Sequence, residues 1–150
     1  MIKNSDLKLI AYLRKNARQT LTDISKKTRI PISTLYDKLR MHENSVILKH
    51  ATLIDFSKLG FNCRANLLLR TNKESREKLG SYLKAHPAVN NLYKINNGFD
   101  FLVEGVFTHV KELEDFIEEL ERNFLLEEKK THYIIEDLKR EDFIPEETCI

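Results

Sequence analysis

The sequence predicts an α/β (α+β) fold of two domains, a helix-turn-helix followed by a ferredoxin-like β-α-β-β-α-β domain. Two observations carry this prediction. Over residues 1–45 the apolar side chains recur at three- and four-residue spacing, which is typical of amphipathic helices. From Phe61 the apolar side chains alternate with polar ones, which is typical of a strand, and helices and further strands then follow.

The bulk composition limits the class of protein. With 150 residues and 41% hydrophobic side chains, the chain has enough apolar surface for one modest core or two small ones. Cys63 and Cys149 are too few for a disulfide framework, which favours a reducing compartment. Charges within residues 1–13 argue against a secretory segment, and no later apolar run is long enough to span a bilayer. We therefore expect a cytoplasmic protein without contact to a membrane.

Charge is divided unevenly along the chain. Residues 1–50 hold 11 Lys/Arg and 4 Asp/Glu, a net charge of +7, whereas residues 51–150 hold 14 and 19, a net charge of −5. These values add up to the net charge of +2 for the whole chain. A basic segment joined to a mildly acidic one indicates that the first domain contacts a polyanion. Uneven composition by chance is the alternative.

Three short helices are predicted in the basic segment. The first covers residues 5–16, and the second follows Thr20 or Thr22, either of which is a suitable N-cap. The second helix stops before Pro31, because the residue before a proline is biased away from helical backbone. The third begins at Ile32 and ends near residue 44. Short helices separated by tight turns are the layout of a helix-turn-helix.

The third helix is the predicted DNA-reading element. If Leu35 and Leu39 point into the core, helical geometry turns Ser33, Thr34, Asp37, Lys38 and Met41 outward, with Tyr36 and Arg40 on the flanks. Hydroxyl groups and cations so placed contact base edges and phosphates. The candidate DNA-binding residues are Lys26, Lys27, Arg29, Ser33, Thr34, Tyr36, Asp37, Lys38 and Arg40. Asp37 either reads a cytosine amino group or pairs with Arg40 or Lys38. The alternative for the whole set is a solvated helix surface.

The second domain is reached through a linking segment. Residues 46–54 are rich in branched apolar side chains, which predicts a strand, and residues 55–60 predict a turn. The pattern then predicts, in order, a strand over 61–70, a helix over 73–85, a strand over 88–96, an Asn-Gly turn, a strand over 99–107, a long helix capped by Thr108, and a strand over 129–136. The predicted divisions are a helix-turn-helix domain at 1–45, a linking strand and turn at 46–60, an assembly and effector domain at 61–137, and a tail at 138–150.

The predicted hairpin carries apolar side chains on both faces. Phe101 and Val103 fall on one face, and Leu102 and Val106 fall on the other. Helices cover only one face of a ferredoxin-like sheet, so the other face needs a partner subunit, and we expect at least a homodimer. The tail either packs across a neighbour through Phe143 or is loose.

Two stretches resemble those of a known family. Residues 32–40, ISTLYDKLR, resemble the recognition helix of the Lrp/AsnC ("feast or famine") regulators of bacteria and archaea. Residues 86–89, HPAV, and residues 95–103, INNGFDFLV, resemble that family's proline-valine strand and its Gly-x-Tyr-Asp turn. The resemblance extends from about residue 4 to residue 139. It implies a winged-helix-like first domain, with Arg29 where the family commonly has glycine, and a RAM- or ACT-like second domain.

The resemblance also implies a function. It implies a sequence-specific transcriptional regulator that binds double-stranded DNA, forms dimers through its second domains and assembles into tetramers or octamers. An amino-acid effector would bind where dimers meet. By position, the effector-site residues are Asn97, Gly98, Phe99, Asp100 and Thr131, with Asp100 facing the ammonium group of the ligand. The alternative is that Asn97 and Gly98 make a hairpin turn that Asp100 caps.

The sequence carries no local signature of an enzyme. No nucleophile stands beside a base and its orienting group, and the glycines are too scattered for a phosphate-binding loop. The five histidines, at 42, 50, 86, 109 and 132, have no metal-ligand spacing. We therefore expect no catalytic residue, no metal and no cofactor. Two alternatives stay open: a tetrapyrrole enzyme similar to the sirohaem decarboxylases, which share the two-domain layout, and an assembly or sensor protein without DNA binding.

Overall fold

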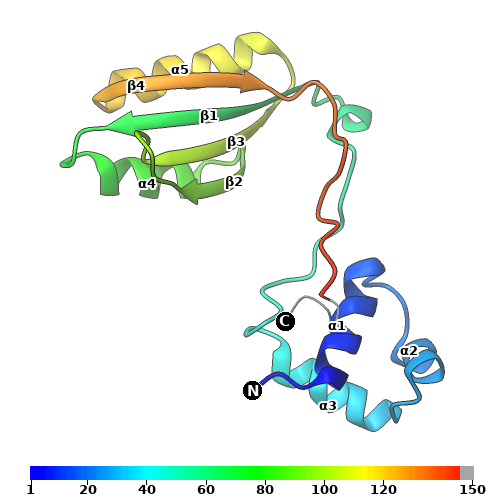
Figure 1. The fold of residues 1–150 in the computed structure, drawn as a ribbon. Coiled ribbons are helices and arrows are strands. Elements are labelled where there is room, and N and C mark those ends of the chain that lie inside the picture. Colours follow the sequence, from blue (N-terminus) through cyan, green and yellow to red (C-terminus); the bar gives the residue numbers. More distant parts are fainter. Residues whose placement is uncertain (146–150) are drawn as a thin grey trace. The chain divides into compact units, whose positions relative to one another are not determined.

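The computed structural model describes residues 1–145, and the chain divides into two compact units (Figure 1). The helical unit comprises residues 1–53 together with the C-terminal segment from Leu138. The sheet unit comprises residues 54–137. Residues 146–150 of the predicted tail, Cys149 among them, lie outside the described residues.

Three helices form the helical unit, as the apolar spacing predicts: α1 (Asn4–Lys15), α2 (Leu21–Thr28) and α3 (Ile32–His42). One side chain from each helix, Leu9, Ile24 and Leu35, is fully buried at their junction. Of the two predicted N-caps of α2, Thr20 has this role, because its hydroxyl accepts the backbone N–H of Asp23 at 3.1 Å. The helices therefore meet around a very small apolar core.

The predicted strand over residues 46–54 is wrong for this chain. Among the described residues, the segment makes only an isolated β-bridge, which joins Ile47 to Glu43. Branched apolar side chains favour extended backbone, but a strand also requires a neighbouring strand to accept and donate its hydrogen bonds. The turn predicted next is confirmed as a short 3-10 helix, η1 (Phe56–Leu59), which ends at Gly60 with a φ of 88°.

The sheet unit has the predicted β-α-β-β-α-β order (Figure 1). Its elements are β1 (Cys63–Thr71), α4 (Arg76–Ala85), β2 (Val89–Lys94), β3 (Phe101–Phe107), α5 (Val110–Asn123) and β4 (Leu126–Tyr133). The strands form an antiparallel sheet in the order β2-β3-β1-β4. The central strands β1 and β3 alternate buried and half-buried residues, as their period of two predicts.

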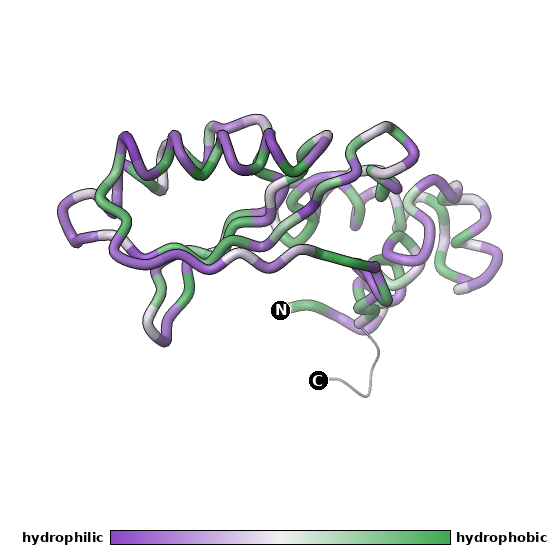
Figure 2. Tube along the Cα trace, turned by 90° about the horizontal axis from the view of Figure 1, so that it is seen from above, coloured by the Kyte–Doolittle hydropathy of each residue, from purple (hydrophilic) through white to green (hydrophobic). Residues whose placement is uncertain are grey.

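Both long helices of the sheet unit cover the same face of the sheet. Leu79 and Leu83 of α4 and Leu113 and Leu120 of α5 share one core with the buried side chains of β1 and β3. Along the tube in Figure 2, hydrophobic and hydrophilic residues alternate within most of the helices and strands, as in amphipathic elements. None of the helices in residues 1–145 is long and apolar enough to cross a membrane.

Apart from the end of β3 at Phe107, the strand ends differ from the predicted ones by one to three residues, most at β4, which also ends three residues early, at Tyr133. Strand β4 begins at Leu126, three residues before the predicted start, because its charged residues are those of an edge strand and give no clear alternation. The N-cap of α5 is His109, whose Nδ1 accepts the backbone N–H of Glu112, rather than Thr108. The hydroxyl and backbone N–H of Thr108 instead donate to the carboxylate of Glu112.

Candidate nucleic-acid interface and hairpin turn

The start of helix α3 presents polar groups to solvent. Ser33 and Thr34 are exposed in its first turn. The N-cap position is Pro31, which has no side chain that accepts a hydrogen bond from the helix. First-turn N–H groups without an internal partner, together with the positive end of the helix dipole, attract anions such as phosphate.

The middle of α3 presents an amphipathic surface. Tyr36 is 51% exposed, and the guanidinium of Arg40 lies 5.8 Å from the centre of its ring. Ile32 and Met41 are also exposed on this helix, although both are apolar. In a major groove, such side chains contact thymine methyl groups, while arginine donates to guanine. These are side-chain types that base reading uses, and a solvated helix surface remains the alternative.

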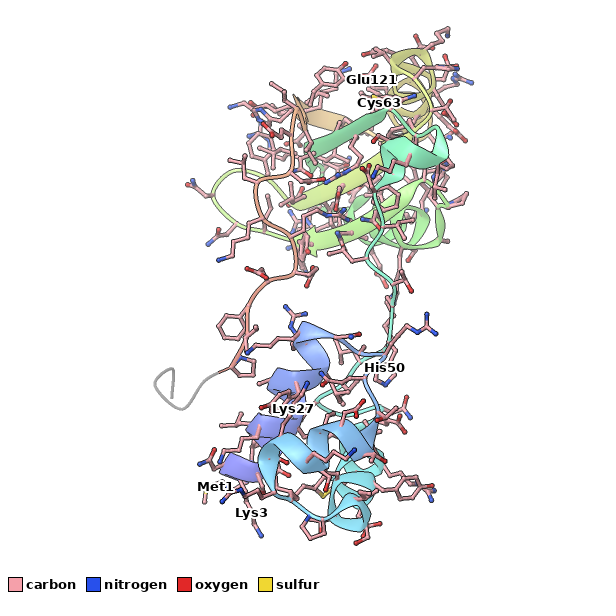
Figure 3. All side chains as sticks on the ribbon, turned by 90° about the vertical axis from the view of Figure 1, so that its right-hand side faces the viewer. Met1, Lys3, Lys27, His50, Cys63 and Glu121 are labelled. Carbon is pink, nitrogen blue, oxygen red and sulfur yellow. The ribbon has the colours of Figure 1, made fainter. Side chains whose placement is uncertain are left out.

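Cations from α2 and the following turn add to this exposed set. Lys26 and Lys27 are exposed in the last turn of α2, and Figure 3 labels Lys27 there. Arg29 follows as the C-cap with a φ of 60°, so its backbone is left-handed and its side chain is exposed. This conformation explains why a glycine suits the position, since glycine adopts it without strain.

Lys38 does not lie on this surface, and the prediction that it points outward is wrong. Its ammonium group lies 2.7 Å from Oδ1 of Asp6, and only 15% of its side chain is exposed. Asp37 is exposed, and among the ion pairs of residues 1–145 none joins it to Lys38 or Arg40. Eight of the nine predicted DNA-binding residues are therefore exposed, and the ninth, Lys38, is turned inward.

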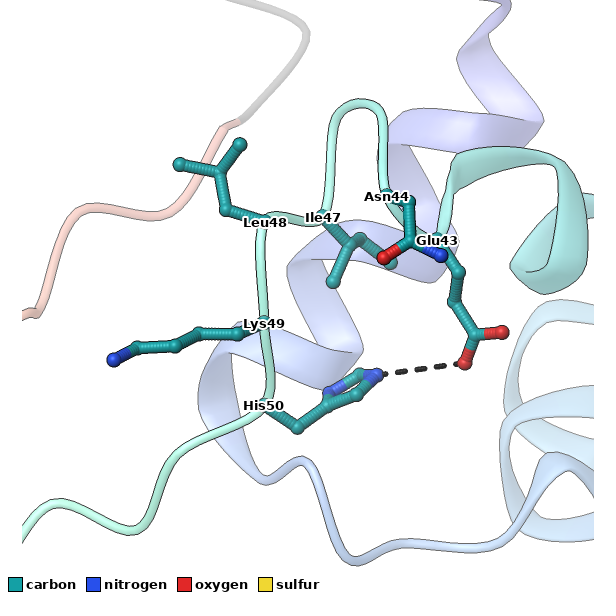
Figure 4. Close-up of a pocket in the computed structure, with 6 residues that line it drawn as sticks. All are labelled: Glu43, Asn44, Ile47, Leu48, Lys49 and His50. Carbon is teal, nitrogen blue, oxygen red and sulfur yellow. Dashed lines mark ion pairs between the residues drawn. The ribbon is translucent and has the colours of Figure 1, made fainter.

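A shallow hollow follows α3 (Figure 4). It has a volume of about 200 Å³ and is lined by Glu43, Asn44, Ile47, Leu48, Lys49 and His50. Nε2 of His50 lies 3.6 Å from Oε1 of Glu43, as the dashed line marks. Ligand pockets usually measure roughly 300–1,000 Å³, so this hollow is too small and open to assign a ligand.

The predicted turn forms at the tip of the β2–β3 hairpin. Asn97 and Gly98 have φ values of 64° and 93°, as expected for an Asn-Gly tip. Nη1 of Arg70 donates to the carbonyl oxygen of Gly98 at 3.4 Å. The ammonium group of Lys130 lies 5.5 Å from the ring centre of Phe99. Two cations that sequence analysis missed therefore lie beside the turn.

Asp100 ties this turn to the neighbouring strand and helix. Its Oδ2 accepts the backbone N–H of Thr71 at 2.9 Å, and its Oδ1 lies 3.0 Å from Nε of Arg76. Both contacts go to β1 and α4 rather than to the turn itself, so the alternative that Asp100 caps the hairpin also remains a prediction. A carboxylate has acceptor positions for further partners, so a contact between Asp100 and a ligand remains a prediction.

Thr131 is not brought to the turn by the contacts of this chain. It pairs with Leu67, whose side chain is in the core, so Thr131 faces the helix-covered side of the sheet. Lys130, the residue before it, makes the contact with Phe99. The role of Thr131 in an effector site also remains a prediction.

The sheet face opposite the helices mixes apolar and charged side chains. Leu68 and Leu102 pair across β1 and β3 on this face, which we call the open face, and both are half-buried. Beside them, Arg64 forms ion pairs with Glu104 at 3.2 Å and with Asp137 at 2.6 Å. The predicted division of the apolar hairpin residues between two faces is confirmed.

The C-terminal segment packs on α1 within the helical unit. Nε of Arg14 donates to the carbonyl oxygen of Phe143 at 2.8 Å, and Nη2 donates to that of Glu141 at 2.9 Å. The carboxylate of Glu141 adds an ion pair at 3.4 Å. Residues 141–143 are therefore held rather than loose, through an arginine that sequence analysis had not singled out.

The chain is similar in sequence to a known protein family and to known transcriptional regulators. A family model described as the Lrp/AsnC ligand binding domain matches residues 65–143, which is more than half of the chain. An HTH-type transcriptional regulator of Pyrococcus furiosus is 26% identical over 119 residues, which cover 79% of each chain. A glutamate uptake regulatory protein of Zymomonas mobilis is 23% identical over 144 residues, which cover 93% of this chain and 88% of that protein.

Solved structures share the fold. A transcriptional regulator of Neisseria meningitidis in complex with L-Met superimposes with a TM-score of 0.88 at 16% identity, over 100% of both chains. AsnC of E. coli superimposes with a TM-score of 0.84 at 13% identity, over 97% of this chain and 99% of its own. At such low identity these two likenesses establish the fold alone.

Proposed function

The chain belongs to the Lrp/AsnC family, and from this premise we propose that it is a DNA-binding transcriptional regulator. In this proposal the helical unit reads double-stranded DNA and the sheet unit joins subunits and binds a small effector. The observation that carries the DNA-binding role is the exposed set of basic and hydroxyl side chains on α2 and α3. The net charge of +7 over residues 1–50 has the sign that attraction to phosphate requires.

The residues of the interface have different roles in this proposal. Lys26, Lys27 and Arg29 contact phosphates, which gives affinity but little sequence preference. Ser33, Thr34, Tyr36 and Arg40 contact base edges from α3, and these contacts give the preference. Asp37 is exposed near this surface, where a carboxylate either accepts from a cytosine amino group or weakens binding by repulsion.

Assembly through the open face completes the proposal. Leu68, Leu102 and Val106 lie on a face that neither α4 nor α5 covers. A second copy with the same face buries them on both subunits. A dimer also presents two helical units, and two-fold symmetric operators match that arrangement. Tetramers or octamers of such dimers are part of the proposal.

The effector site is proposed at the hairpin turn. Asn97, Gly98, Phe99 and Asp100 would border it. Thr131 of β4 belongs to the proposal through the family resemblance alone, because in this chain it faces the helix-covered side of the sheet. Gly98 has no side chain to hinder approach to its backbone groups, and its φ of 93° is one that glycine adopts without strain. An amino-acid effector is supported by the family and by the charged groups next to the turn. Calorimetric titration with the twenty amino acids tests this part, and silence with all of them contradicts it.

The first experiment measures DNA binding by fluorescence anisotropy. The probe is a duplex spanning the start of the protein's own gene, and an unrelated duplex of equal length is the control, each at several salt concentrations. A specific regulator prefers its own fragment by roughly a hundredfold or more and weakens steeply with salt. Undetectable binding to both fragments at low salt contradicts the proposal and favours a sensor without DNA binding.

A further inference from the structure

A buried ionic cluster joins helix α1 to helix α3. Asp6 is 2% exposed, and its Oδ1 lies 2.7 Å from the ammonium group of Lys38. Nε2 of His42 lies 3.3 Å from the same oxygen. This nitrogen is buried, and the angles of the contact are not those of a hydrogen bond. Both partners of Asp6 come from α3, which is the proposed reading helix.

Asp6 is itself fixed on α1. Its Oδ2 accepts the backbone N–H of Lys3 at 2.7 Å, so the carboxylate closes the first turn of its own helix. The hydrogen bond from Lys38 is the main reason that the pKa of Asp6 is lowered from 3.8 to about 2. Asp6 is therefore an anion near neutral pH, held in one position against a cation.

The ionic cluster supplies directional contacts between α1 and α3, which the small apolar core lacks. Among residues 1–145, the fully buried apolar residues at the junction of the three helices are Leu9, Ile24 and Leu35. The hydrophobic residues packed against them are only partly buried: Tyr12, Leu13, Leu21, Ile30 and Leu39. Apolar contacts are non-directional, so a core of this size constrains rotation of α3 about its axis only weakly. Buried ion pairs give little net stability, because removing charges from water is costly, but they demand one geometry.

The helical periodicity relates the cluster to the DNA surface. Lys38 and His42 are four residues apart, so they lie on one side of α3 and face Asp6 from two successive turns. Tyr36 and Arg40 each lie two residues from Lys38, about 160° around the helix from it. Any rotation that moves Lys38 away from Asp6 therefore turns the proposed base-reading side chains by the same angle.

We infer that Asp6, Lys38 and His42 are positioning residues, which fix the rotation of α3 on α1 and thereby the sequence preference of DNA binding. Lys38 then acts through Tyr36 and Arg40 and does not contact phosphate. This inference rests on the proposed DNA-binding function. It assigns a role to buried charged side chains that are not part of the exposed DNA-binding surface.

The test replaces the ion pair with apolar side chains of similar size, in the double variant Asp6→Leu/Lys38→Met of the full chain. Anisotropy is measured with the own-gene and unrelated fragments across salt concentrations, and thermal unfolding is followed by circular dichroism. We expect the melting temperature to be retained or raised. The preference for the own-gene fragment falls at least tenfold, while the dependence of affinity on salt is unchanged.

Two further variants make the result decisive. Lys26→Met, in an exposed cation of α2, is the matched control, and it reduces the salt dependence while keeping the preference. Asp6→Asn keeps the shape of the side chain and removes its charge. If the double variant does not fold, the binding measurement is made with Asp6→Asn at a temperature below the melting temperature of that variant. Its preference also falls, because Lys38 loses its anionic partner. Lys38→Arg keeps the charge, so it is expected to retain much of the preference.

The outcomes separate this inference from the proposed function. Wild-type protein without any preference between the fragments overturns both. Wild-type preference that persists undiminished in the folded double variant, or in Asp6→Asn, overturns the positioning role alone. Reduced salt dependence in the double variant, with its preference intact, identifies Lys38 as a phosphate contact and likewise overturns the inference.

Discussion

The guanidinium of Arg14 donates from Nε to the carbonyl oxygen of Phe143 over 2.8 Å, which links helix α1 to a residue 129 positions later in the chain. Two contacts to Glu141 extend this link. Glu141 has a φ of 46°, a backbone conformation that non-glycine residues rarely adopt. The family match reaches residue 143 and so includes this segment.

Arg14→Ala is expected to release residues 138–145 from α1. The contacts are solvent-exposed, so the free energy of unfolding should change by less than about 1 kcal/mol. Hydrogen exchange followed by mass spectrometry should show faster exchange in this segment. Arg18→Ala, in the nearby loop, is the control and should leave exchange unchanged. Equal exchange in Arg14→Ala and wild type would mean that other contacts hold the segment.

The helical unit is expected to lose stability in acid through Asp6. Its pKa of about 2 in the folded state lies below its ordinary value of 3.8. The stabilisation is therefore fully present above pH 4 and is lost as the pH falls toward 2, with a magnitude of about 2 kcal/mol. Urea unfolding of wild type and Asp6→Asn at a series of pH values measures the difference. If both proteins depend on pH identically between pH 5 and pH 2, the assignment is wrong.

Lys26 and Lys27 are expected to act as phosphate contacts. Replacing each by glutamine should reduce the slope of log affinity against log salt by about 0.9. The preference for the own-gene fragment should change little, because phosphates carry no sequence information. Lys84→Gln, an exposed lysine of α4, is the control. An unchanged slope in both α2 variants would place the DNA on another surface.

Asp100→Asn is expected to destabilise the sheet unit. It removes the charge from the acceptor of the Thr71 N–H and breaks the ion pair with Arg76. Losing a charge-assisted hydrogen bond of this kind costs roughly 1–3 kcal/mol. Urea unfolding gives the value, and Arg76→Gln should cost less because Arg76 is the more exposed partner. Unchanged stability with loss of effector binding would instead favour a direct ligand contact.

The open face is expected to join two subunits. Leu68→Glu places a charge among half-buried apolar side chains and should convert the dimer into a monomer of 17.7 kDa. Lys78→Glu, on the exposed side of α4, is the control and should keep the dimer. Light scattering at micromolar concentration measures both. A monomeric wild-type protein would be incompatible with this interface.

The predicted helices and central strands agree with the structure because their patterns are local. Leu9, Ile24 and Leu35 each belong to an apolar pattern of helical spacing within their own helix, and each is buried. β1 and β3 alternate over their whole length because one face of the sheet is covered. The signal is weaker at β4, an edge strand with charges on both faces, and its start was displaced by three residues. Residues 46–54 have strand composition without a partner strand in this chain.

The sequence indicates which residue types lie in the candidate sites, but it does not indicate which side chains contact one another. The exposure of Ser33, Thr34, Tyr36 and Arg40 follows from the position of Leu35, because helical geometry fixes their directions. Lys38 belongs to the same pattern and is nevertheless turned inward, because Asp6 on another helix attracts it. No spacing along the chain indicates an interaction between residues 32 positions apart.

By itself, the sequence determined the two-part architecture, the basic character of the first part, the order of strands and helices, and the Asn-Gly turn. Each of these depends on periodicity, composition or backbone preference, which act over a few residues. The tertiary structure alone decided which charged groups meet: Lys38 with Asp6, Arg76 with Asp100, and Arg14 with the C-terminal segment. Long polar side chains have many accessible conformations, and only the folded arrangement of distant segments selects a partner for each of them.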